Sequence, residues 1–228
     1  MVVASKQLHD WFETDAGHRV LACERDHLLP MVANYRPFRS LDMTRGLLLQ
    51  DSLSRELVAL TTESAVHSDN KTAQVVSDSG RLPFASESFD LVVCAHLHEL
   101  SASAGEMVAD MSRVLTSGGL CVFFGFNPHG IWRRSDYGNI DWWSCPSVPS
   151  DLQALGDMFL LKTLFCDHIG FGGLKKPAHP VSRLGMQMLK HTLPGASVLY
   201  RLVMRKQVLS RTGLLIDEVE AMRSASVG

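Results

Sequence analysis

Hydrophobic positions in the middle of the chain predict a strand, a helix and a second strand in succession. The run Phe89–Ala95 is apolar apart from one acid, which is typical of a strand buried on both faces of a parallel sheet. Across Met107–Leu115 the apolar residues recur as on one helix face, and Gly118 and Gly119 are expected to end that helix. The run Leu120–Phe126 is again almost wholly apolar. This βαβ order predicts an α/β fold whose parallel sheet is covered by helices on both faces.

Elements of the same two kinds are expected on either side of this unit. Apolar residues over Lys6–Asn34 recur at helical intervals and predict an N-terminal helical layer. Further short apolar runs are bounded by turn-forming residues. They predict a helix at Leu152–Leu161 and strands at Phe38–Met43, Leu57–Leu60, Ala73–Val76, Lys162–Asp167 and Ser197–Met204.

Length and composition exclude several classes of protein. The 228 residues are 46% hydrophobic and 20% charged, which suits one domain with a real core and excludes a disordered polyelectrolyte or a coiled coil. No stretch approaches the ~20 apolar residues that cross a bilayer, and the first ten residues lack the apolar run of a secretory signal. We therefore expect a soluble, cytoplasmic protein. The five cysteines form no CxxC pair, which argues against a disulfide framework or a thiolate zinc site.

The net charge of -2 conceals an uneven distribution of charge along the chain. No acidic residue lies between Asp167 and Asp217, whereas eight lysines and arginines do. Two interpretations remain open for this basic C-terminal region: a surface for an anionic partner, or a solvated face that pairs with the acidic remainder of the molecule. No cluster is dense enough to indicate nucleic-acid binding by itself.

Short motifs within residues 73–130 carry a family resemblance. Asp78–Phe84 combines an acid and small residues with Leu-Pro-Phe, and Ser88–Asp90 reads Ser-Phe-Asp. Arg113–Gly119 reads Arg-Val-Leu-Thr-Ser-Gly-Gly, and Phe126–Pro128 reads Phe-Asn-Pro. Together these motifs resemble those of class I S-adenosylmethionine-dependent methyltransferases, in particular the type 11 group. The resemblance implies a Rossmann-like, seven-stranded, mostly parallel sheet with helices on both faces and an antiparallel last strand.

The resemblance also implies a single domain over residues 1–228 that is made of segments with different roles. Its expected parts are an N-terminal helical layer (1–36), a cofactor-binding core (37–126), a substrate-side segment (127–160), C-terminal strands with a helical insert (161–212) and a tail (213–228).

The resemblance implies that S-adenosylmethionine binds beyond the carboxyl ends of the strands. The loop after the first strand is expected to hold its amino-acid part and sulfonium, through Asp42, Thr44 and Gly46. Glycines in this loop allow close approach of the backbone to a ligand. This chain retains Gly46 but has Thr44 and Leu48 where the family has glycine.

Five further residues are implied as cofactor contacts. Glu63, after the second strand, is the nearest candidate for the carboxylate that grips the ribose hydroxyls; a solvated loop acid is the alternative. Asp78, after the third strand, resembles the acid that bonds the adenine amino group, with the backbone of Ser79 beside it; a helix or turn cap is the alternative. Ala95 and His96, just past the fourth strand, are expected beneath the cofactor.

His96 and His98 are the candidate catalytic residues. An imidazole titrates near neutrality and suits a general base, and both side chains would share a face at the strand mouth if the strand continued. A role in the pocket wall is the first alternative. A metal site is the second; it needs a third ligand from Glu99, His129 or Asp136, and no metal is expected.

The acceptor is expected next to the end of the fifth strand, where the resemblance implies substrate contacts. Asn127, Trp132 and Trp142 are the candidates. Stacking of a planar or cationic substrate on the tryptophans and ordinary packing of these rings are both compatible with the sequence.

Two functions remain open at this stage. The first is a methyltransferase that transfers the methyl group of S-adenosylmethionine to an unidentified, small-molecule acceptor by bringing the two reactants together. The second is a methyltransferase-like protein without cofactor, which serves as a binding or regulatory subunit for a protein partner. The replacements Thr44 and Leu48, together with Arg45 between the glycine positions, support the second.

Overall fold

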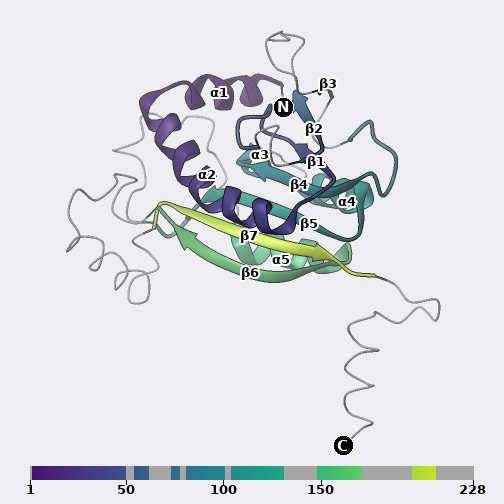
Figure 1. Cartoon of the computed structure of the whole chain (residues 1–228). Coiled ribbons are helices and arrows are strands. Elements are labelled where there is room, and N and C mark those ends of the chain that lie inside the picture. The colour runs from purple at the N-terminus through teal and green to yellow at the C-terminus, as the bar shows by residue number, and fades with distance from the viewer. Residues whose placement is uncertain are drawn as a thin grey trace, which may run out of the picture.

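A seven-stranded sheet forms the centre of the molecule (Figure 1). The computed structural model describes residues 2–49, 54–61, 73–77, 81–100, 104–130, 148–170 and 197–208. The strands, in chain order, are β1 (Arg39–Asp42), β2 (Glu56–Thr61), β3 (Ala73–Val76), β4 (Phe89–Ala95), β5 (Leu115–Phe126), β6 (Leu161–Ile169) and β7 (Leu199–Lys206).

The strand order is β3-β2-β1-β4-β5-β7-β6. The first five strands in this order pair in parallel, and β7 lies antiparallel to both β5 and β6. This confirms the Rossmann-like sheet with an antiparallel last strand. In such a sheet the order reverses between β1 and β4, and ligands bind at that point beyond the carboxyl ends of the strands.

Helices cover both faces of the sheet. They are α1 (Val2–Phe12), α2 (Asp15–Tyr35), α3 (Leu97–Leu100), α4 (Ala104–Val114) and α5 (Pro149–Met158). On β7, Arg201 donates a hydrogen bond to the carbonyl of His27 in α2, whereas Met204 lies against Gly156 in α5. Because residues 201 and 204 point to opposite faces of a strand, α2 and α5 cover opposite faces, as Figure 1 shows. None of the described helices has the length and apolar character needed to cross a membrane.

The prediction that Gly118 and Gly119 end a helix was wrong. Helix α4 already ends at Val114, and the next residue pairs with Phe89 on β4, so both glycines lie inside β5. The register between β4 and β5 shifts there, and Gly118 adopts φ 82° to allow it. A Cβ atom on Gly119 would lie 2.9 Å from the carbonyl oxygen of Thr116, so the backbone packs too closely for a side chain.

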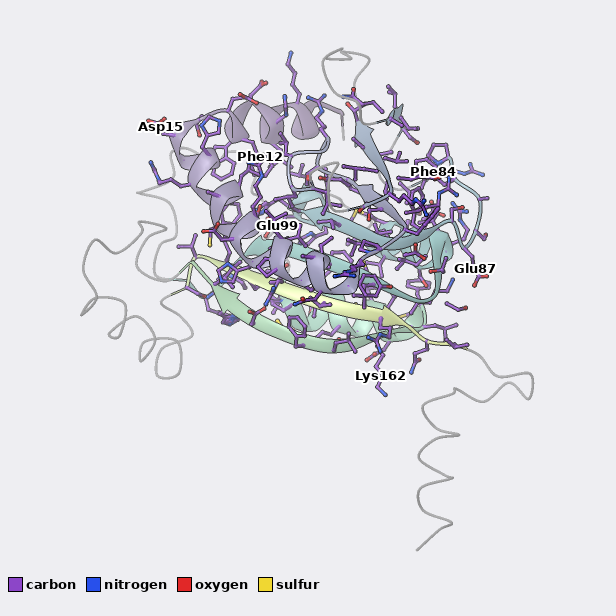
Figure 2. The ribbon with its side chains drawn as sticks, in the orientation of Figure 1. Phe12, Asp15, Phe84, Glu87, Glu99 and Lys162 are labelled. Atoms are coloured by element: carbon purple, nitrogen blue, oxygen red, sulfur yellow. The ribbon has the colours of Figure 1, made fainter. Side chains whose placement is uncertain are left out.

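Two of the family-like motifs hold each other together. The guanidinium of Arg113, near the end of α4, donates hydrogen bonds to the carbonyls of Phe84 (2.7 Å) and Leu82 (2.9 Å). The same guanidinium pairs with Asp110, whose other oxygen accepts the amide of Leu82. The Leu-Pro-Phe segment, with Phe84 labelled in Figure 2, is thereby fixed against α4.

Asp90, the acid of the Ser-Phe-Asp motif, lies at the amino end of the sheet. One carboxylate oxygen accepts the backbone amides of Phe38 and Arg39, each at 3.0 Å, and the other accepts the Thr116 hydroxyl at 3.3 Å. It therefore joins the starts of β1, β4 and β5. This acid supports the scaffold from the edge opposite the expected cofactor site.

Candidate functional site

The loop after β1 is organised by the buried carboxylate of Asp42. One oxygen accepts the backbone amide of Thr44 at 2.7 Å and also its hydroxyl. The other oxygen accepts the amides of Leu48 at 3.0 Å and Leu49 at 2.9 Å. Burial raises the pKa of Asp42, and these hydrogen bonds oppose that effect. A single side chain thus closes the loop around its own backbone amides.

The two residues that replace family glycines direct their side chains away from the solvent side of this loop. The Thr44 hydroxyl bonds Asp42, and Leu48 is fully buried in the hydrophobic core. Arg45 and Gly46 both adopt left-handed backbone conformations, at φ 59° and 79°. Glycine adopts this conformation freely, whereas arginine does so at a cost of about 1–2 kcal/mol.

A hollow of about 280 Å³, open mouth included, lies between this loop and α1. The loop contributes four lining residues, α1 contributes three and α3 contributes one. They are Met43, Thr44, Arg45 and Leu47 from the loop, Leu8, His9 and Phe12 from α1, and Leu97 from α3. Figure 2 labels Phe12 at the end of α1. Among these described lining residues, Arg45 is the only one with a permanent charge.

The outer side of the loop is held from α2. The Arg25 Nε donates a 2.6 Å hydrogen bond to the carbonyl of Leu47. Since Asp42 fixes the loop amides and Arg25 fixes a loop carbonyl, the backbone beneath the hollow is constrained on both sides.

A buried triad of charged groups lies beside the hollow, at the end of β4. The His96 ring donates through Nδ1 to Glu99 Oε2 (2.7 Å) and through Nε2 to Glu24 Oε1 (2.9 Å). All three side chains are buried, and Glu99 Oε1 also accepts the amide of Phe126 at 2.8 Å. Two donating ring nitrogens require an imidazolium when both partners are carboxylates. The triad therefore joins α2, α3 and the end of β5; Figure 2 labels Glu99, one of its three members.

Burial and the neighbouring carboxylates shift the pKa of His96 in opposite directions. Burial alone lowers it, but the carboxylates of Glu24 and Glu99 and their hydrogen bonds outweigh burial and raise the pKa of His96 to about 9. Burial also raises the pKa of Glu99, against the effect of the His96 cation. The proton therefore stays on His96 at neutral pH.

The expectation that His96 and His98 share a strand face was wrong, because the strand does not continue. Strand β4 ends at Ala95, His96 turns the chain at φ 58°, and α3 begins at Leu97. His98 is buried elsewhere, with its Nε2 2.7 Å from the Tyr200 hydroxyl. Burial and the nearby His96 cation lower the pKa of His98 to about 3. Both imidazoles thus lie in the interior, bonded to other protein groups.

The remaining described candidates separate into two places. Ala95 is buried at the end of β4, below the turn at His96. Asn127 is almost fully buried and bonds within its own neighbourhood: its side-chain amide donates to the Ser197 hydroxyl at 2.7 Å, and its Oδ1 accepts the amide of His129. It fixes the turn after β5 to the chain before β7.

Several candidates lie outside the described residues. They are Glu63, Asp78, Ser79, Trp132, Trp142 and Asp136. Of the basic C-terminal region, Arg201, Arg205 and Lys206 are described. Arg201 forms a bidentate ion pair with Asp167 at 2.9 Å, and Lys206 pairs with Glu87 at 3.5 Å. Within the described part of the chain, no group of histidine, cysteine or acidic side chains could hold a metal ion.

Sequence reasoning missed Glu24 and the part that α1 plays in the hollow. Glu24 lies within an apolar helical stripe, between the buried residues Val20 and Leu28. An acid four residues from each is the signal for a buried, paired charge. The three α1 residues of the hollow gave no comparable signal, because an apolar stripe is also the pattern of ordinary core packing.

The comparisons with known proteins concern part of the sequence and the fold. Residues 46–123 match the sequence profile of a methyltransferase domain family. No curated protein sequence matches the chain.

Solved structures resemble the chain over most of its length. An S-adenosylmethionine-dependent methyltransferase from Archaeoglobus fulgidus is 15% identical at a TM-score of 0.63, covering 82% of this chain and 94% of that one. The N-methyltransferase NodS from Bradyrhizobium japonicum, solved with S-adenosylhomocysteine, is 13% identical at a TM-score of 0.57, covering 89% of this chain and 98% of that one. A Haloferax volcanii complex of the Trm112 methyltransferase activator and a methyltransferase gives 15% identity at a TM-score of 0.56, covering 79% of this chain and 89% of that one.

The sheet order and these structural likenesses define the fold of class I S-adenosylmethionine-dependent methyltransferases. Within that fold, residues 46–123 match the methyltransferase domain model.

Proposed function

We propose that the protein is an S-adenosylmethionine-dependent methyltransferase that binds its cofactor in the hollow above the loop after β1. The observation that carries this proposal is the position of the hollow: it lies at the carboxyl end of β1, over a loop that Asp42 holds in a fixed shape. This is the edge where parallel α/β sheets bind their ligands.

The residues of the hollow fit the amino-acid end of the cofactor. Thr44 bonds Asp42 and Leu48 packs into the core, so neither replacement fills the hollow with a bulky side chain. The lining comes from the loop, α1 and α3, and we assign to it only the amino-acid end of the cofactor. The ribose and adenine contacts assigned to Glu63, Asp78 and Ser79 stay predictions.

S-adenosylmethionine supplies a methyl group on a sulfonium, which an oxygen, nitrogen or carbon nucleophile can attack. The contribution of the protein is to hold the two reactants in line, which raises the rate through proximity and orientation. His9, a half-buried imidazole in the lining, is our candidate for accepting the acceptor's proton. The buried, internally bonded positions of His96 and His98 favour structural roles for them.

Titration calorimetry with S-adenosylmethionine and S-adenosylhomocysteine tests this proposal. We expect saturable binding of both, and we expect Asp78→Ala to weaken it by about 1.5–3 kcal/mol if that acid bonds the adenine. Arg39→Gln is the control, because Arg39 pairs with Glu56 at the opposite edge of the sheet. Absence of binding by the wild-type protein at millimolar ligand would reject the proposal.

A second candidate function is a cofactor-free binding or regulatory subunit with a protein partner. The observation that favours it is Arg45, which adds a cation to the lining of the hollow where a cationic sulfonium cofactor would bind. The Haloferax volcanii methyltransferase bound to an activator shows that one protein of this fold works in a protein complex. The same titration separates the two candidates, since only the first requires ligand binding. The cytoplasmic location also stays a prediction.

A further inference from the structure

We infer that Arg45 is the carboxylate anchor of the hollow, which selects ligands carrying an α-carboxylate. This inference rests on the proposed function and adds to it a specificity residue. It begins from the juxtaposition of one guanidinium with a largely apolar lining: Arg45, His9 and Thr44 line the hollow together with Leu8, Phe12, Met43, Leu47 and Leu97.

The backbone geometry supports a functional reason for this arginine. Arg45 occupies a left-handed conformation at φ 59°, which is unfavourable for a residue with a Cβ atom. The loop is nevertheless fixed in this shape by Asp42, which bonds the amides of Thr44, Leu48 and Leu49, and by Arg25, which bonds the carbonyl of Leu47. Residues with a strained backbone that the surrounding structure holds in place are concentrated at ligand sites.

The chemistry of the lining defines the ligand. A largely apolar hollow with one guanidinium suits a molecule with an apolar body and one anionic end. The planar guanidinium presents paired N–H donors that match the two oxygens of a carboxylate. In S-adenosylmethionine and S-adenosylhomocysteine, the thioether or sulfonium chain ends in an α-carboxylate. Arg45 would bond this group, and the chain would contact the apolar walls.

The position of Arg45 also explains how the loop functions with fewer glycines. A glycine-rich loop binds its ligand through backbone amides, but here the amides of Thr44, Leu48 and Leu49 are bonded to Asp42. The Arg45 side chain, in the lining of the hollow, would then hold the anionic end.

The test compares two ligands that differ only in the carboxylate. Wild type, Arg45→Gln, Arg45→Lys and the control Arg55→Gln are titrated with S-adenosylhomocysteine and with its decarboxylated analogue. The substitution Arg55→Gln removes one positive charge, as Arg45→Gln does, but just before β2. There the Arg55 guanidinium lies 5.6 Å from the centre of the Phe38 ring. A thermal melt of each variant establishes that it is folded.

We expect Arg45→Gln to weaken binding of S-adenosylhomocysteine about ten- to 100-fold, the range for a lost charge-assisted hydrogen bond, and not to weaken binding of the decarboxylated analogue. Arg45→Lys, which keeps the charge but not the paired donors, should fall between. Arg55→Gln should bind both ligands as wild type does. Equal losses for both ligands in Arg45→Gln, or no loss for either, would overturn the anchor while leaving the proposed function intact. Failure of the wild-type protein to bind either ligand would overturn both.

Discussion

Replacing Glu24 by glutamine tests the buried triad with little change of shape. In the wild-type protein both His96 nitrogens donate to carboxylates, and burial excludes water from the group. The pKa of His96 is about 9, against an ordinary value of 6.5. At about 1.4 kcal/mol per pH unit, this difference corresponds to about 3 kcal/mol of folding free energy.

The sign of the pH dependence follows from the direction of that difference. The folded protein binds the His96 proton more tightly than the unfolded chain does. The stabilisation is therefore complete below about pH 6.5 and is lost as the pH rises through about 9. Glu24→Gln removes one of the two carboxylates that hold the proton, so the pKa of His96 should fall, and the pH-dependent stabilisation should be smaller and fully lost at a lower pH. We expect a cost of about 2–4 kcal/mol at pH 7, because removing one partner leaves an imperfectly compensated buried charge.

Urea unfolding at pH 6, 7.5 and 9 measures both effects. The matched control is Glu56→Gln, whose carboxylate pairs with Arg39 at 2.7 Å while about half exposed, and which should cost less than about 1 kcal/mol with no change in the pH profile. If Glu24→Gln lost no more stability than this control, and kept the wild-type pH profile, the triad would have no role in holding α2 to the sheet.

Three further substitutions test the scaffold around the site. Gly125→Ala should cost about 1–3 kcal/mol in urea unfolding, because its Cβ atom would lie 2.5 Å from the Tyr200 ring; wild-type stability would contradict this close packing. Tyr200→Phe should cost about 1–3 kcal/mol by the same assay, since it removes the hydroxyl that bonds the buried His98; a neutral result would contradict that bond. Arg113→Gln should speed amide hydrogen exchange over residues 81–84, because the guanidinium bonds the carbonyl of Phe84; unchanged exchange there would show that the motif is held otherwise.

The sheet could be predicted from sequence wherever strands are buried on both faces. Strand β4 begins and ends at the predicted residues, because a continuous apolar run bounded by polar residues defines it. Strand β3, a partly exposed edge strand, also has the predicted bounds. The start of β5 could not be predicted, because Gly118 and Gly119 are usual at a helix end. They are here required by a change in strand register and by contact with the Thr116 carbonyl.

The site could be predicted only in part. The loop after β1 was located correctly, because an acid, a glycine and a preceding strand occur in sequence there. The triad could not be predicted, since Glu24 and His96 are 72 positions apart and meet only when α2 packs on the sheet. The spacing of His96 and His98 predicted a shared strand face, but a single left-handed residue separates them. Local spacing cannot reveal such a turn.

Hydrogen exchange with and without S-adenosylhomocysteine tests most directly whether the hollow is the binding site. A ligand that binds there contacts the loop after β1 and the adjacent face of α1. We expect slower amide exchange in residues 43–49 and 8–12, together with a rise in stability of about 2.7 kcal/mol at one hundred times the dissociation constant. Slower exchange confined to other segments, or none at saturating ligand, would contradict the assignment of this hollow as the cofactor site.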